Sequence, residues 1–275
     1  MAKLSSLNPW LNGPNTDRMP VLFLGHGSPM NAIEENEFVA GFRQQAALIP
    51  KPKAILCVSA HWMTRGTEVT AMATPRTIHD FGGFPPELYE VQYPAPGQPE
   101  LASALPELLN PIQVGLDQNW GLDHGAWSVI KHLYPQADIP VVQMSLDIGL
   151  SPAGHAELAA RLAELRNKGV LIIGSGNTVH NLGRVAWHRL NEVGYAFDWA
   201  EEARLWINQH VRSGNLPALC DYEKQGSAMR LAVPTSEHYL PLLYSLGVRQ
   251  GEELIAVFND KALAGSLAMT SFRIG

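Results

Sequence analysis

The chain has 275 residues, and 46% of them are hydrophobic, enough for one large domain or two small ones with a substantial core. Lys and Arg number 20 against 26 Asp and Glu, which gives a formal net charge of −6. Because no basic run could neutralise a row of phosphates, we expect no nucleic-acid partner.

The cysteine content and the hydropathy of the chain indicate in which cellular compartment the protein is located. The two cysteines are Cys57, inside an apolar run, and Cys220, so a disulfide framework is not expected. Residues 1–20 contain Pro, Asn and Gly where a signal peptide needs an apolar stretch, and no segment approaches the roughly 18 apolar residues of a membrane span. We therefore expect a soluble cytoplasmic protein with no membrane partner.

Two apolar runs in the N-terminal part of the chain end abruptly in a small or polar residue, as buried strands of a helix-covered sheet do. They are Pro20 to Leu24 and Ala54 to Ser59. Between them, Glu34 to Leu48 has a partial 3.6-residue period, which predicts a helix. The pattern begins as strand, helix, strand.

The stretch from Thr74 to Pro99 interrupts this alternation with repeated prolines and glycines. A loop of this length inside a compact domain is often functional. We therefore expect an ordered loop close to the functional site.

Helical periods return at Pro99 to Leu109 and at Ala126 to Leu133, and a strand pattern follows at Pro140 to Leu146. The clearest helix runs from Ser151 to Lys168. Its first residue can cap it, the proline after that residue suits the first turn, and the glycine that follows Lys168 stops it.

The C-terminal part continues with a strand pattern at Val170 to Ile173, helical periods at Phe197 to Val211 and Glu237 to Leu246, and a strand pattern at Leu254 to Phe258. Strands and helices thus alternate through much of the chain. This order predicts an α/β fold, a single domain with a central, mostly parallel or mixed β-sheet flanked by helices.

Four of the ten histidines fall at the ends of predicted elements. His26 and His61 each come just past a predicted strand, where ligands bind in open α/β sheets. His180 follows the third of these strands after a glycine-rich turn, and His238 is expected at the start of a helix. Neutral imidazole is a good ligand for divalent iron or zinc, so these positions predict a metal site.

His124 has two interpretations. It lies among glycines and tryptophans that suggest a pocket wall, or it belongs to a helix N-terminus that Asp123 caps. His79 either lines the same pocket or pairs with Asp80. The histidines within or beside helical patterns are assigned to surface or packing. These are His132, His155, His188 and His210.

Five motifs occur in an order that resembles the class III extradiol ring-cleaving dioxygenases of the protocatechuate 4,5-dioxygenase type, and most closely the DOPA extradiol dioxygenase branch. They are Gly25 to Met30, Ser59 to Trp62, Asp123 to Gly125, Gly176 to Asn181, and Thr235 to Pro241. The resemblance extends from about Met19 to the C-terminus. It predicts an N-terminal extension, residues 1–18, and a catalytic domain, residues 19–275.

The resemblance implies an enzyme that uses Fe(II), in a site that Zn(II) also fits. By match to the family motifs, His26 and His61 become metal ligands and His180 becomes the acid/base group. The third ligand is a glutamate in the protocatechuate type and the histidine of a Glu-His pair in the DOPA branch. That comparison points to His238, with Glu237 as the fallback.

The implied substrates are O2 and a catechol such as L-DOPA, cleaved at its 4,5 bond to a ring-opened semialdehyde. A histidine with a pKa of ~6.5 can take and return protons at neutral pH, which suits His180. His124 is assigned a second catalytic role, holding the substrate or oxygen. The expected substrate contacts are His79, Trp62 and Trp127.

Two other classes of function stay open. A zinc-dependent hydrolase would use similar ligands, with hydrolysis in place of oxygen uptake. A non-catalytic binding protein could share the same fold. A serine hydrolase is disfavoured because neither Ser28 nor Ser175 lies in a Gly-x-Ser-x-Gly elbow. The sequence leaves open the oligomeric state and the physiological catechol.

Overall fold

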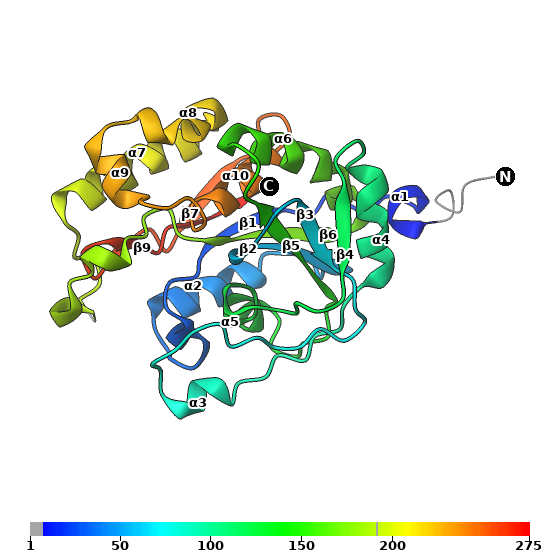
Figure 1. Ribbon diagram of the computed structural model, residues 1–275, viewed down its shortest axis with the longest axis horizontal. Helices are drawn as coiled ribbons and strands as arrows, with labels where there is room; N and C mark the ends of the chain where they lie inside the picture. Colours follow the sequence, from blue (N-terminus) through cyan, green and yellow to red (C-terminus); the bar gives the residue numbers. More distant parts are fainter. Residues whose placement is uncertain (1–7, 191) are drawn as a thin grey trace.

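A mixed sheet of eight strands runs through the part of the chain that the computed structural model describes, residues 8–190 and 192–275. The strand order is β4-β3-β5-β2-β6-β1-β10-β7, and helices lie on both faces (Figure 1). The strands are β1 Val21–Gly25, β2 Ala54–Thr64, β3 Thr67–Thr70, β4 Val114–Asp117, β5 Val141–Asp147, β6 Val170–Gly176, β7 Ile255–Phe258 and β10 Ser271–Ile274. The predicted α/β class is confirmed.

The centre of the sheet is parallel. Strand β6 pairs in parallel with both β1 and β2, and β2 pairs in parallel with β5. Antiparallel pairing occurs toward the edges, where β10 joins β1 to β7 and β3 pairs with β5. The C-terminal ends of β1, β6 and β2 therefore meet at one edge of the sheet, the usual position of a ligand site in α/β folds.

Each predicted strand is present, with one correction. The apolar run that begins at Ala54 continues as β2 to Thr64, and its register against β5 shifts between Val58 and Met63. His61 therefore lies inside β2, within this irregularity, and not past the end of the strand. An irregularity of this kind bends a strand and re-aims its side chains.

Helices cover the sheet in two layers (Figure 1). Helices α4, α6 and α10 contribute to one apolar core, and α2 and α5 contribute to the core on the other face. The clearest predicted helix is α6, and its last predicted turns form a 3₁₀ segment, Ala163–Lys168. The helices are α1 Pro9–Asn12, α2 Glu37–Ala46, α3 Pro86–Tyr89, α4 Pro99–Leu108, α5 His124–Leu133, α6 Pro152–Leu162, α7 Asp198–Ser213, α8 Leu216–Cys220, α9 Ser227–Ala232 and α10 Leu240–Gly247.

The described part of the predicted N-terminal extension packs against the domain. Trp10 in α1 is buried, the Asn8 side chain donates to the carbonyl of Glu100, and Lys168 donates to the carbonyl of Gly13. Residues 1–7 of the extension lie outside the described residues. No helix in the described ranges is both long enough and apolar enough to cross a membrane.

The loop from Thr74 to Pro99 is ordered and carries the short helix α3. It is tied to the domain by hydrogen bonds, among them one from Trp127 Nε1 to the carbonyl of Ile78, at 2.8 Å. His79 Nε2 contacts the carbonyl of Val91 at 2.9 Å, which closes the loop on itself. These bonds hold the segment around residue 80 against α5.

Candidate metal centre and active site

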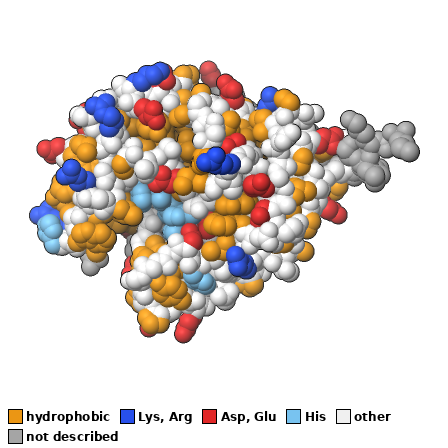
Figure 2. Space-filling view, viewed as in Figure 1, with side chains coloured by type: hydrophobic (Ala, Val, Ile, Leu, Met, Phe, Trp, Pro, Cys, Tyr) orange, Lys and Arg blue, Asp and Glu red, His pale blue; other side chains and the backbone are white. Residues whose placement is uncertain are grey.

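Histidines from five separate segments meet at the C-terminal edge of the parallel strands. His26 follows β1, His61 lies in β2, His124 begins α5, His180 follows β6, and His238 precedes α10. Neighbouring rings have centroid separations between 3.5 and 5.8 Å. Histidine side chains gather near the middle of the face in Figure 2, sunk among other side chains. The predicted convergence of His26, His61, His180 and His238 is observed.

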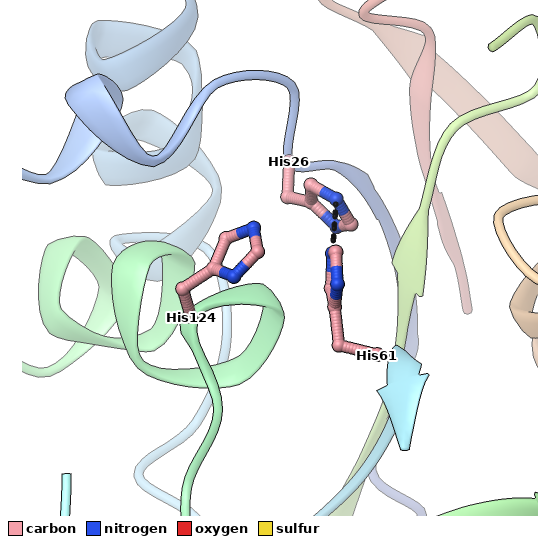
Figure 3. A group of neighbouring side chains, drawn as sticks. All are labelled: His26, His61 and His124. Atoms are coloured by element: carbon pink, nitrogen blue, oxygen red, sulfur yellow. Dashed lines mark hydrogen bonds between the residues drawn. The ribbon is translucent and has the colours of Figure 1, made fainter. Parts of the chain in front are cut away.

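The ring of His26 has a defined tautomer. Its Nδ1 lies 3.0 Å from Ser175 Oγ, and that hydroxyl donates its own hydrogen to the carbonyl of Gly125. The hydroxyl must therefore accept from the Nδ1–H group, which leaves the lone pair on Nε2. This Nε2 lies 3.2 Å from Nε2 of His61 (Figure 3).

Asp80 contacts two of the other histidines. Its Oδ2 lies 3.5 Å from Nδ1 of His61, and its Oδ1 lies 3.0 Å from Nδ1 of His124. The negative charge of a nearby carboxylate attracts an N–H group and repels a lone pair, so we expect both Nδ1 atoms to carry hydrogen. The lone pairs of these rings are then on Nε2, as in His26. Two Nε2 lone pairs that face one another at hydrogen-bond distance suit a shared cation.

His238 pairs with its neighbour in sequence. Its Nδ1 lies 3.2 Å from Glu237 Oε1, which also accepts from Thr235 Oγ1 at 2.8 Å. Burial raises the pKa of Glu237, but the hydrogen bond from His238 and further donors outweigh it and lower the pKa to about 2. Glu237 is therefore an ionised acceptor, and it leaves Nε2 of His238 for a ligand.

The candidate ligand atoms form two groups, and within each group all of them lie within 4.8 Å of one another. One group is His26, His61 and His124, and the other is His180, Glu237 and His238. The predicted triad of His26, His61 and His238 takes residues from both. Buried imidazoles with free lone pairs, from several segments, are the usual donors for divalent iron or zinc.

Burial keeps the rings of His26, His61 and His180 neutral. Desolvation, and then the neighbouring His61, lowers the pKa of His26 well below 6.5, and desolvation followed by His124 does the same to His61. The pKa of His180 is lowered to about 3 by burial and by His238. A neutral imidazole offers its lone pair to a metal or to a proton without first losing one.

Two glycines allow the segments to approach this closely. A Cβ on Gly176 would lie 2.1 Å from the carbonyl oxygen of His238. A Cβ on Gly125 would lie 2.4 Å from Ser59 Oγ and 2.8 Å from Cδ2 of His61. Side chains at these positions would separate the histidines.

The capping interpretation of this region is confirmed, and the ring of His124 also lies in the histidine cluster, while its role as a pocket wall stays a prediction. Asp123 caps α5 by accepting from the backbone of Ala126, and it is buried with Ser59 and Gln143 as donors. His124 is the first residue of that helix, and its ring faces those of His26 and His61 (Figure 3). The cap therefore orients a histidine of the cluster.

Among the described residues, no ring contact joins the residues predicted to bind substrate to the histidines of the cluster. Trp62 stacks on Trp120 with centroids 5.5 Å apart, and Trp127 is fully buried beneath the loop. His79 packs on Trp127 at 5.6 Å and its Nε2 bonds to the loop backbone. In the described ranges, the side-chain partners of Asp80 are His61 and His124, and the pairing with His79 that the sequence allowed is not seen. Their roles in substrate binding stay predictions.

Sequence reasoning missed Asp80, Ser175 and Phe81. Phe81 meets His124 edge to face, with centroids 5.5 Å apart, and therefore borders the cluster. Asp80 and Phe81 are adjacent in the loop that was expected near the site, so the loop itself was the available signal. Ser175 lies inside β6, where its buried hydroxyl gave no sign of its partner.

The remaining histidines serve packing or lie on the surface, as expected. His132 bonds to the carbonyl of Asn31, and His155 is buried against Tyr244. His210 packs on Trp206, and His188 is exposed.

Comparison with known proteins assigns the family. A family model described as the catalytic LigB subunit of aromatic ring-opening dioxygenase matches residues 20–268. The chain is 47% identical over 271 residues, 95% of this chain and 96% of the relative, to an Escherichia coli K12 protein named 4,5-DOPA dioxygenase extradiol. A Beta vulgaris protein of the same name is 38% identical over 262 residues, 91% of this chain and 94% of the relative.

A crystal structure of an uncharacterized protein from Escherichia coli K12 matches with a TM-score of 0.80 and 43% identity, and the match covers 94% of this chain and 100% of that one. The histidines are thus arranged on a fold already seen in a close relative. The chain belongs to the LigB family of aromatic ring-opening dioxygenases.

Proposed function

We propose that this protein is an extradiol dioxygenase that opens the ring of a catechol, with L-DOPA cleaved at its 4,5 bond as the first candidate. The observation that carries the proposal is the convergence of five histidines at the sheet edge, three of which burial keeps neutral. The identity of 47% to a protein named for this reaction supports the choice of substrate. Both atoms of O2 enter the ring-opened semialdehyde, so the reaction needs no external reductant.

We propose one divalent metal, Fe(II) for activity with Zn(II) able to occupy the same position, bound by Nε2 of His26, His61 and His238. The support is that each ring has an acceptor at Nδ1, provided by Ser175 for His26, Asp80 for His61 and Glu237 for His238. Metal-bound histidines nearly always have such a partner. When bound, iron would supply the electronic coupling between an electron-rich catechol and O2.

Glu237 was the alternative to His238. Its ionised oxygen faces Nδ1 of His238 and the hydroxyl of Thr235. This favours Glu237 as the residue that orients His238, and His238 as the ligand. His124 competes for the same place, because its ligand atom lies within 4.8 Å of those of His26 and His61.

The acid/base role falls to His180. Burial lowers the pKa of His180 and the charge of Glu237 raises it, and the ring stays neutral at physiological pH, so one ring nitrogen has a lone pair that can accept the proton of a catechol hydroxyl and return it during ring opening. His124 would hold substrate or oxygen through Nε2, since its Nδ1 faces Asp80. Phe81 borders His124 and offers an aromatic wall for a flat ring.

We also keep the cytoplasm as the proposed location. Cys57 and Cys220 are both free thiols, and free thiols are typical of a reducing compartment.

The test is oxygen uptake by protein loaded anaerobically with Fe(II), followed over a panel of para-substituted catechols that includes L-DOPA. We expect oxygen consumption together with a yellow ring-opened product. The control is a resorcinol isomer of the catechol, whose hydroxyl groups are not on adjacent carbons. It should support no oxygen uptake. If no catechol supports oxygen uptake, the proposal is wrong and the hydrolase or binding-protein interpretation takes its place.

A further inference from the structure

Asp80 lies where the long loop meets the histidine cluster. The residues on either side of it hold the backbone, because His79 and Phe81 both pack on the buried ring of Trp127, with centroids 5.6 and 6.3 Å away. The Asp80 side chain is 18% exposed. Its carboxylate is thus presented to the cluster by a supported backbone.

The two carboxylate oxygens have separate partners. Oδ1 accepts the backbone N–H of His124 at 2.9 Å and lies 3.0 Å from Nδ1 of the same residue. Oδ2 lies 3.5 Å from Nδ1 of His61. Among the described residues, Nδ1 of His124 makes no hydrogen bond, and Asp80 acts on it through the charge that lies 3.0 Å away.

Neutral imidazole has one N–H group and one lone pair, and the partner of one nitrogen decides which nitrogen has which. A carboxylate near Nδ1 favours hydrogen there and repels a lone pair. The same carboxylate therefore favours a free Nε2 in both His61 and His124. Without it, each ring could adopt the other tautomer, whose Nε2–H group cannot bind a metal.

We propose that Asp80 is a positioning residue that fixes the tautomer and orientation of His61 and His124 together, so that a metal ligand and its catalytic neighbour are prepared by one carboxylate. This inference rests on the metal centre proposed above. It goes further by making the long loop part of that centre, because the loop supplies the carboxylate.

The first test reads the tautomers directly. Two-bond ¹H–¹⁵N correlation spectra of the metal-free protein at pH 7.5 distinguish Nδ1–H from Nε2–H rings. We expect His61 and His124 as Nδ1–H tautomers in the natural protein. In Asp80→Ala both rings should shift toward the Nε2–H form. In the isosteric Asp80→Asn, the amide NH2 faces one ring as a donor, so at least one of the two should shift.

The second test measures metal affinity by competition of Zn²⁺ with a chromophoric chelator. Loss of a residue that orients a ligand typically weakens metal binding by about 10–100-fold, and we expect that range for Asp80→Ala. Glu90→Gln removes an exposed carboxylate from the same loop and should bind Zn²⁺ as the natural protein does.

The inference would be wrong if both rings kept their tautomers in the Asp80 variants, or if both variants bound Zn²⁺ with wild-type affinity. Asp80→Asn keeps the shape of the side chain, so it provides the test if Asp80→Ala does not fold. Neither measurement uses ring cleavage. If the wild-type protein cleaves no catechol but the Asp80 variants show these changes in tautomer and Zn²⁺ affinity, the proposed reaction is wrong and the role of Asp80 is supported.

Discussion

His180 lies flat against His238, with ring centroids 3.5 Å apart and planes inclined by only 9°. The lone pair of an imidazole lies in the plane of its ring. The lone pairs of two stacked, nearly parallel rings therefore do not point toward one common position. By contrast, the ring of His61 is inclined to that of His238 by 89°, which lets their lone pairs converge. This geometry supports the proposed assignment of His238 as a ligand and of His180 as the proton-transfer residue.

We expect His180→Ala to retain most of the metal and to lose ring cleavage by about 10²–10⁴-fold, the usual contribution of positioned proton transfer. The measurement is metal content by mass spectrometry together with kcat for the iron-loaded protein. Nearly natural turnover would show that another group, with His124 the first candidate, moves the protons.

His238→Ala is the matched control, because it removes the other ring of the stacked pair. This variant should lose both metal and activity. If it kept its metal while His124→Ala lost it, the third ligand would be His124.

The sequence was informative about single residues where the local context was distinctive. His26, His61, His180 and His238 could be selected because each lies at an element boundary or in a family motif. Asp80 could not be selected, because its partners are 19 and 44 residues distant in sequence. Which histidines a carboxylate contacts depends on the tertiary fold, so the spacing of residues in the sequence does not predict it.

Strand β6 and the segment before α10 determine how near His238 comes to the other histidines. The backbone N–H of Asn177 donates to the carbonyl of His238 at 2.8 Å, and Gly176 lies beneath the same carbonyl. The contact is between two main chains. Neither backbone segment can move aside by a change of rotamer, as a flexible side chain would.

We expect Gly176→Ala to destabilise the protein by about 1–3 kcal/mol, the range for overpacking a filled interior. It should also weaken metal binding, because the added Cβ pushes His238 away from the cluster. Urea unfolding and Zn²⁺ competition would measure the two effects. Gly82→Ala is the control, since a Cβ there meets nothing within 4 Å. Equal behaviour of the two variants would contradict the prediction.

Elements with strong internal patterns were predicted, and those defined by their neighbours were missed. Strands β1, β5 and β6 are apolar runs buried along nearly their whole length. Strand β4 is short and only partly buried, and β10 mixes Ser and Arg with its apolar residues, so neither has a recognisable period. Such strands form because an existing sheet edge offers them hydrogen bonds.

At the scale of the whole molecule, the site depends on the complete fold. Its histidines range from His26 to His238 in sequence, and they meet only when the parallel strands align and both helix layers are in place. A metal bound there would favour the folded state alone, and it would stabilise the protein in proportion to the logarithm of metal concentration.

His155 in α6 contacts Tyr244 in α10, and it makes global stability depend on pH. It is fully buried, with Nδ1 3.0 Å from the Tyr244 hydroxyl. Burial lowers its pKa to about 4, against the partial opposition of Asp147. Between pH 6.5 and 4 the unfolded chain therefore binds a proton that the folded protein does not. Stability should rise with pH across this window and fall on acidification.

We expect the His155 contribution to approach about 1.4 kcal/mol per pH unit within that window. His155→Asn keeps a polar group near Tyr244 but cannot titrate, and comparison with the natural protein cancels the effect of the other histidines. The measurement is the urea-derived free energy of unfolding of both metal-free proteins at pH 7.5, 6.5, 5.5 and 4.5. The natural protein should lose more stability than the variant at each step below pH 6.5. Parallel curves would mean that His155 is protonated equally in the folded and unfolded states.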